Sequence, residues 1–165
     1  MGKQKGFTFI EIILYVVIVS IMMAALIPFA WDVIGGASKS GAQQEVFSQA
    51  RFVSERIKYE IRNASGITSV GASSISLTNF SPDTTTVIDL SGGKIRINKN
   101  GAGAVNLNSD DTNVTNLTFT NYTSGDNKTK HIQFSFTIDD NYGSSRQEYD
   151  VPVQTIQGSA EVRSN

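Results

Sequence analysis

The sequence predicts an α+β protein in which a long N-terminal α-helix packs on an antiparallel β-sheet. Residues 12–31 carry no charged side chain, and residues 46–64 place apolar side chains at helical spacing. Beyond residue 67, short segments alternate apolar and polar residues between turn sequences rich in glycine and asparagine. We therefore expect four parts: a short basic segment at 1–6, a stem helix at 7–34, an amphipathic helix at 35–66 and a β-rich head at 67–165.

The uncharged run from Ile12 to Trp31 has the length of a membrane-spanning helix. At 1.5 Å per residue it extends roughly 30 Å, the thickness of one hydrocarbon core. Lys3 and Lys5 precede it, and basic residues favour the cytoplasmic side. A secretory signal would have a shorter apolar core and a small-residue cleavage site, which this run lacks. We therefore expect a single membrane pass with the head outside the cytoplasm.

Glu11 is an acidic residue at the start of this apolar segment. A carboxylate in a bilayer costs about 2.5–3.5 kcal/mol on insertion scales. Such a residue indicates a functional role by default, and it requires a partner.

The surrounding residues have a specific pattern: Met1 to Gly6 form a short basic leader, and Phe7-Thr-Phe-Ile-Glu11 follows. This pattern resembles the processing and methylation site of type IV prepilins and the related pseudopilins. The resemblance is strong over residues 1–34 and looser over the following helix. It implies that a prepilin peptidase cuts between Gly6 and Phe7 and methylates Phe7. It also implies that Glu11 meets the free amine of a neighbouring subunit during assembly.

Pro28 lies inside the apolar run, where proline removes a helical hydrogen bond and clashes with the preceding turn. One interpretation is a simple kink near the membrane exit. The other follows from the resemblance, because the stem helix of this family often loses its hydrogen bonding near such a proline when packed in a filament. On that interpretation Pro28 contributes to assembly.

The second half of the helix is predicted to be amphipathic. Arg56 and Glu60 form an expected i,i+4 pair worth a few tenths of a kcal/mol. Phe52 and Tyr59 fall nearly opposite the apolar stripe, either lying flat on the helix, covered by a loop, or forming a second packing face for neighbouring subunits. The residues around Asn63 suit a helix end. The stripe comprises Val46, Ala50, Val53, Ile57, Ile61 and Ala64.

The head is predicted to be one meander sheet with one packed face and one wet face. The apolar stripe of the helix is the expected cover for the packed face. The alternating apolar residues are Ile75 and Leu77, Ile95 and Ile97, Leu117 and Phe119, Ile132 to Ile138, and Tyr149, Val151 and Val153. The expected turns are 91–93, 100–101, 124–126 and 140–143.

Residues suited to catalysis or cofactor binding are scarce. There is no cysteine, and His131 is the only histidine, so nucleophile pairs are not predicted. Carboxylates at 110–111 and 139–140 offer oxygen ligands for calcium, but neither spacing matches an EF-hand loop. We therefore predict no metal and no cofactor. Formal net charge is −1, and removing Lys3 and Lys5 leaves −3, so no direct contact with nucleic acid is indicated.

These observations predict a non-enzymatic structural subunit, a minor pilin or pseudopilin of a type IV pilus-like filament. Its expected partners are the membrane, the prepilin peptidase, other pilin or pseudopilin subunits and the assembly platform. The expected location is the cytoplasmic or inner membrane of a prokaryote, and then a cell-surface filament. Two alternatives stay open: a pseudopilin of a type II secretion or competence machine, and a membrane-anchored extracellular binding domain that does not polymerise.

Overall fold

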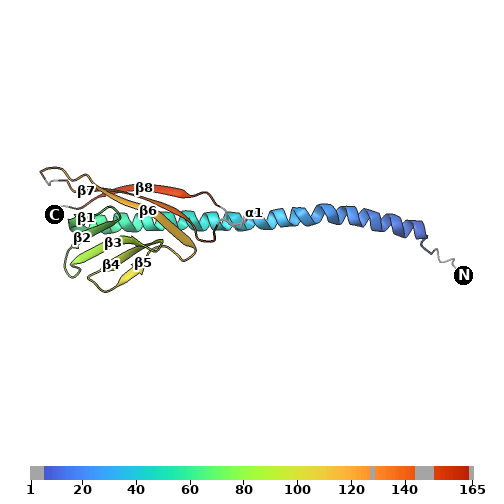
Figure 1. Cartoon of the computed structure of the whole chain (residues 1–165), viewed down its shortest axis with the longest axis horizontal. Helices are drawn as coiled ribbons and strands as arrows, with labels where there is room; N and C mark the ends of the chain where they lie inside the picture. The colour runs from blue at the N-terminus through green and yellow to red at the C-terminus, as the bar shows by residue number, and fades with distance from the viewer. Residues whose placement is uncertain (1–5, 127–128, 144–150, 164–165) are drawn as a thin grey trace. The chain divides into compact units, whose positions relative to one another are not determined.

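The computed structural model describes residues 6–126, 129–143 and 151–163. The chain divides into two compact units, residues 1–38 and 39–165. A single helix, α1 (Phe9–Asn63), begins in the first unit and ends in the second (Figure 1). The division into leader, stem, amphipathic helix and head stays a prediction, although the helix ends three residues before the expected position 66.

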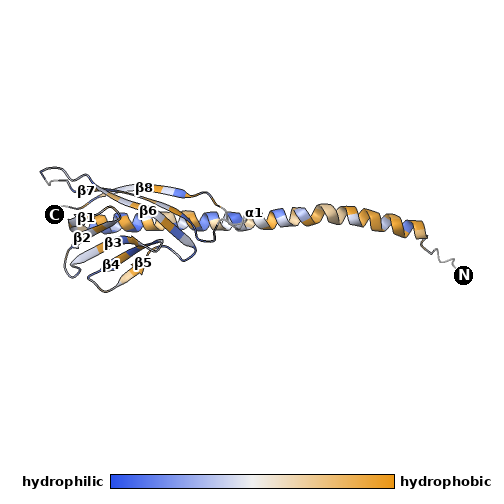
Figure 2. Cartoon of the chain, in the orientation of Figure 1, coloured by the Kyte–Doolittle hydropathy of each residue, from blue (hydrophilic) through white to orange (hydrophobic). Residues whose placement is uncertain are grey.

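The first unit consists, in its described residues 6–38, of the start of α1 and the short segment before it. Its large apolar side chains, from Phe9 to Ile34, are exposed within the chain. Figure 2 shows this part of α1 as almost continuously hydrophobic. By length and composition α1 is able to cross a membrane. A helix that is apolar all round is normally covered by lipid or by other protein.

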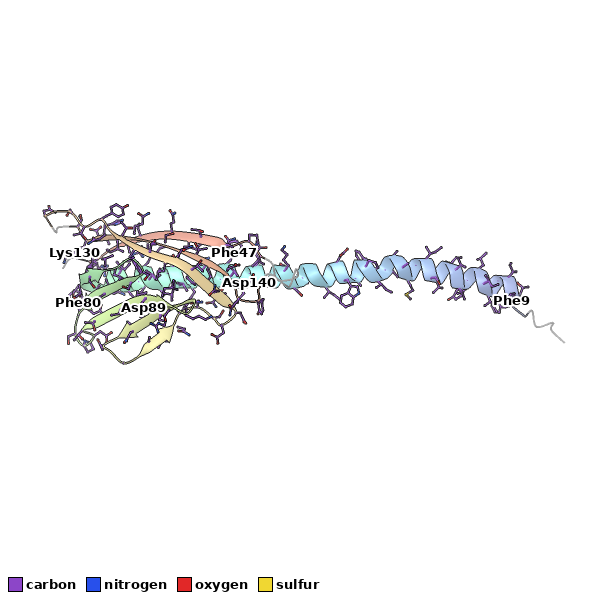
Figure 3. All side chains as sticks on the ribbon, viewed as in Figure 1. Phe9, Phe47, Phe80, Asp89, Lys130 and Asp140 are labelled. Carbon is purple, nitrogen blue, oxygen red and sulfur yellow. The ribbon has the colours of Figure 1, made fainter. Side chains whose placement is uncertain are left out.

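The second unit packs one stripe of α1 against β-sheets, and this confirms the predicted stripe. Val53, Ile57 and Ile61 are completely buried, and Val46 and Ala50 are almost so. Their four- and three-residue spacing keeps them on one side of the helix. Phe47, Phe52 and Tyr59 stay about half exposed. Figure 3 labels Phe47 on this part of the molecule.

Within the described residues, eight antiparallel strands form two sheets, each a meander. The five-stranded sheet contains β1 (Ala64–Val70), β2 (Ser74–Asn79), β3 (Thr85–Ser91), β4 (Lys94–Lys99) and β5 (Ala104–Asn106). The three-stranded sheet contains β6 (Thr112–Asn121), β7 (His131–Asp140) and β8 (Gln154–Glu161). The predicted α+β class, a long helix packed on antiparallel sheet, is confirmed.

The sequence predicted one sheet, and the structure corrects this to two. The last strand of the first sheet, β5, has only three residues, and the chain after it stays bonded to the start of β4. Asn108 Oδ1 accepts from Ile95 N at 2.9 Å, and Asn108 Nδ2 donates to Thr112 O at 3.0 Å. Lys94 adds a bond from Nζ to Thr112 O at 2.8 Å. The next strand, β6, then pairs with β7 and not with β5.

The two sheets and the helix share one hydrophobic core. Ile75, Leu77 and Ile95 contribute from the first sheet, and the rings of Phe134 and Phe136 from β7 are stacked with centroids 6.4 Å apart. Buried residues alternate with less buried ones along β2, β4 and β7, as the sequence predicted, and along β6 on either side of its register shift. The two predicted turns at 91–93 and 100–101 are confirmed by positive φ at Gly92, Gly93, Asn100 and Gly101.

The last strand is not where the sequence placed it. Tyr149 lies outside the described residues, and Val151 and Val153 are not in a strand. Pro152, which has no N–H to donate, lies between them, and β8 begins only at Gln154. Within β8, Ile156 and Ala160 are apolar, but the position between them on the same face is Gly158, because Phe134 fills the space: a Cβ there would lie 2.9 Å from Phe134 Cε1 and closer still to Cζ.

The predicted i,i+4 pair of Arg56 and Glu60 is confirmed, but Glu60 is buried. Its side chain is only 3% exposed, and its carboxylate contacts Arg56 at 2.7 Å and Lys99 of β4 at 3.0 Å. Glu60 therefore links α1 to β4 through a buried carboxylate and two partly exposed cations.

Candidate functional site

The helix start carries a reciprocal capping contact. Thr8 precedes α1, and its Oγ1 accepts from Glu11 N at 3.4 Å while Thr8 N donates to Glu11 Oε2 at 3.4 Å. This is the capping-box arrangement, in which the Thr and Glu side chains satisfy each other's backbone donors. Both distances exceed the usual 2.7–3.2 Å of N–H···O bonds, so the contacts are weak. The Glu11 carboxylate therefore stays accessible to a stronger partner.

Phe7 and Glu11 are brought together one turn apart. With Ile12 and Tyr15 they line a shallow hollow of about 360 Å³ on the side of the helix start. Phe7 is 80% exposed, and no described residue of the second unit takes part in the hollow. The two residues to which the resemblance gives the N-terminal amine and its acidic partner are thus neighbours on the surface.

Gly6 has no structural requirement for glycine. A Cβ placed there would meet nothing within 4 Å, and its φ lies outside the region that favours glycine. The fold of the described chain therefore does not explain why this residue is glycine.

Pro28 lies within α1, and the helix continues through it. Because proline has no N–H, the carbonyl of Ala24 four residues earlier lacks its intrahelical donor. Elsewhere in this unit, Ser20 Oγ donates to Val16 O at 2.7 Å, a bond that competes with the helix ladder. The kink and assembly interpretations of Pro28 both stay predictions.

Phe52 and Tyr59 lie in the second unit, on the side of α1 that the sheets leave open. Each is 55% exposed. Arg56, between them, places its guanidinium 5.3 Å from the centroid of the Tyr59 ring. Both aromatic residues border a groove of about 880 Å³ between α1 and the end of β8. They are therefore neither covered by a loop nor isolated, and their predicted contact with neighbouring subunits stays a prediction.

The acidic turns considered for calcium lie side by side. Asn141 N donates to Asp111 O at 2.9 Å, and Asn141 Nδ2 donates to Asp110 O at 2.9 Å. A cation is already present there, because Lys94 Nζ lies 3.6 Å from Asp110 Oδ1 and bonds to carbonyls of Ser109 and Thr112. Within the described ranges no group of three or more His, Asp or Glu side chains is arranged to hold a metal.

His131 begins β7, and its backbone carbonyl accepts from Tyr122 N at 2.8 Å. The centroid of its ring lies 6.5 Å from that of the Tyr122 ring.

Comparison with protein families identifies the motif at the start of the chain. The family model described as the prokaryotic N-terminal methylation motif matches residues 1–27. The chain carries the type IV pilin and pseudopilin signature. Comparison with curated proteins and with solved structures gives no match.

The methylation motif characterises proteins that are structural rather than catalytic. It implies processing by a prepilin peptidase, assembly with other pilins and anchoring through an apolar N-terminal helix. The matched residues contain Gly6, Phe7 and Glu11, and they end one residue before Pro28.

Two features of the site were missed at the sequence level. The Thr8-x-x-Glu11 capping box was readable from the spacing alone, as a threonine followed three residues later by a glutamate before an apolar run. The groove was not readable, because it brings Arg62 of α1 together with Arg163, which follows β8 a hundred residues later.

Proposed function

We propose that this chain is a structural subunit, a pilin or pseudopilin of the minor type, of a type IV pilus-like filament. The methylation motif over residues 1–27 is the observation that carries the proposal. The subunit inserts into the membrane with one pass, keeps its head outside the cytoplasm and enters the filament through α1.

Processing takes place between Gly6 and Phe7, and Phe7 becomes the methylated N-terminus. The absence of any steric reason for glycine at position 6 supports this assignment. A small residue there lets the peptidase approach the backbone closely. Residues 1–6 then form the leader, residues 7–34 the stem, residues 35–66 the amphipathic helix and residues 67–165 the head.

Glu11 pairs with the Phe7 amine of a neighbouring subunit. The weak 3.4 Å contacts of its carboxylate support this role, because a full positive charge is a better partner than one backbone N–H. Two opposite charges about 4 Å apart interact by about 4 kcal/mol at an effective dielectric near 20, before desolvation. The pairing also fixes the axial register of stems whose apolar surfaces alone could slide.

Pro28 lets the stem adapt when subunits pack, since the helix there lacks one hydrogen bond and needs little energy to open. The exposed faces of Phe52 and Tyr59 add a contact between heads. Both roles belong to the same filament and require neighbouring chains.

The experiment is fractionation of cells that make the tagged chain together with the other filament subunits and the assembly platform. We expect the chain in sheared surface filaments as well as in membranes. A chain that stays entirely in the membrane fraction, while the other subunits are sheared off normally, would favour the membrane-anchored binding domain instead.

A further inference from the structure

The groove between α1 and β8 has an apolar floor and a polar rim. Phe52 and Tyr59 provide the floor, and Ser159, Ala160 and Glu161 of β8 border the opposite side. Its volume is about 880 Å³. All of these residues belong to the second unit.

Among the residues that the structure describes, β8 forms one wall of the groove and pairs with a strand on one side only. One hydrogen bond shows which of its residues direct their backbone groups toward that strand, β7. Val162 N donates to Lys130 O at 2.9 Å, so even-numbered residues of β8 direct their backbone groups toward β7. In an antiparallel strand, successive residues direct their backbone N–H and C=O groups alternately to one neighbouring strand and to the opposite side. Thr155, Gln157, Ser159 and Glu161 therefore direct their N–H and C=O groups to the open side. Arg163 N, in the same phase, reaches Arg62 O at 3.4 Å, which shows that this edge faces the end of α1.

The other sheet edges in the described chain have features that discourage pairing with another chain. The register of β1 shifts twice, β5 has three residues, and β6 has a register shift and donates to the first sheet from Val114 N and Phe119 N. Short edges, bulges and coverage all discourage pairing with another chain. In contrast, β8 pairs with β7 over eight residues without a shift and contains no lysine or proline.

The charges at the end of the groove select an acidic partner. Arg62 and Arg163 are exposed, and neither makes an ion pair with a described residue. Of the other charges of the groove, Arg56 binds Glu60, and Glu55 binds Lys58 at 2.9 Å. Glu161 also borders the groove and makes no ion pair with a described residue, so the two arginines and this acid together leave one positive charge. The Lys58 ammonium, which hydrogen-bonds to Glu55, holds the pKa of that carboxyl below its usual value, so the Glu55–Lys58 pair is neutral overall.

We propose that the groove binds an extended, acidic segment of another protein, which adds a strand antiparallel to β8. Its main chain pairs with the four open residues of β8, its apolar side chains contact Phe52 and Tyr59, and its acidic end meets Arg62 and Arg163. Strand addition of this kind takes affinity from main-chain bonds and specificity from side-chain pockets.

A second copy of the chain is a poorer occupant. In the second unit β8 runs alongside α1 and ends beside its last turn at Arg62 (Figure 1). Two β8 strands paired about a twofold axis would therefore set this part of the two helices antiparallel. In such an antiparallel pair, Arg62 and Arg163 would meet the start of the second β8, where Gln154 and Thr155 offer no acidic group.

The test uses the full chain in detergent micelles and measures amide hydrogen exchange residue by residue. The probe is an acetylated peptide of two aspartates followed by three valine-threonine repeats, and its control carries two lysines in place of the aspartates. We expect the acidic probe at millimolar concentration to slow exchange at Thr155, Gln157, Ser159 and Glu161. The even-numbered amides are already bonded to β7 and should change little. Protection without this alternation, or no protection at all, would overturn the proposal.

Matched variants test the edge and the charge separately. Gln157→Pro removes an outward N–H and leaves the bonds to β7, so it should weaken probe binding about tenfold or more. Gln157→Ala removes only the side chain and should bind as the wild type does. Arg62→Glu should weaken the acidic probe roughly three- to tenfold and favour the lysine peptide. The charge variant tests the proposal even if the proline variant fails to fold.

Two further outcomes would also overturn it. Equal binding to the proline and alanine variants would exclude strand addition, and concentration-dependent dimers that protect the same amides without probe would identify a second copy as the occupant. The proposal goes beyond filament assembly. Its failure would leave that function standing, because peptide binding is measured on the isolated chain.

Discussion

Replacing Glu11 by glutamine separates the two contacts open to this side chain. Glutamine keeps the acceptor that Thr8 N uses at 3.4 Å in the capping box, and it loses the negative charge. Leucine removes both, and aspartate keeps the charge on a shorter side chain. The three variants therefore distinguish a role in helix capping from a role in pairing with another subunit.

The free energies of the two contacts indicate that the negative charge of Glu11 matters more than its role in the helix cap. A helix cap is worth typically about 1 kcal/mol, and contacts as long as 3.4 Å fall below that value. An ion pair between Glu11 and a neighbouring amine is worth about 4 kcal/mol before desolvation, and losing it would leave the neighbour's ammonium unpaired in an apolar stem bundle. We therefore expect incorporation to fall in the order wild type, Glu11→Asp, then Glu11→Gln and Glu11→Leu together.

The assay compares the fraction of each tagged variant in sheared filaments with the fraction in membranes. All four proteins should insert and be cut after Gly6, which serves as the internal control. Incorporation of Glu11→Gln at the wild-type level, with only Glu11→Leu excluded, would refute ion pairing and assign Glu11 to helix capping.

Three further predictions concern the core and the stem. In a chain of residues 38–165, Ile57→Asp should lower the free energy of unfolding by several kcal/mol, because Ile57 is completely buried; an unchanged melting temperature would contradict the packing described. Gly158→Ala should cost about 1–3 kcal/mol through its clash with Phe134, and Phe134→Leu should recover part of that loss in denaturant unfolding. Pro28→Ala should insert normally yet alter filament yield or flexibility, so filaments of normal yield and mechanics would leave only the kink interpretation.

The helix and the regular strands could be predicted because their own side chains determine their burial. Val53 and Ile57 are apolar at helical spacing, and Phe134 and Phe136 alternate along β7, so each pattern is complete within its element. The methylation motif was readable for the same reason, since its residues are contiguous.

The features that could not be predicted depend on partners distant in sequence. Gly158 interrupts the apolar face of β8 between Ile156 and Ala160, because Phe134 on another strand occupies its space. Glu60 carries a charged side chain, yet it is buried because Lys99 on β4 supplies a second cation at 3.0 Å. The second sheet forms because β6 pairs with β7 and not with β5, a choice between strands that the alternation within each strand does not contain. The open edge of β8 follows from topology alone.

The most direct test of the filament-subunit account is the intact mass of the chain isolated from membranes and from sheared filaments. The account predicts a chain that starts at Phe7, lacks residues 1–6 and carries one additional methyl group in both fractions. A full-length, unmethylated chain in cells that contain an active prepilin peptidase would contradict it.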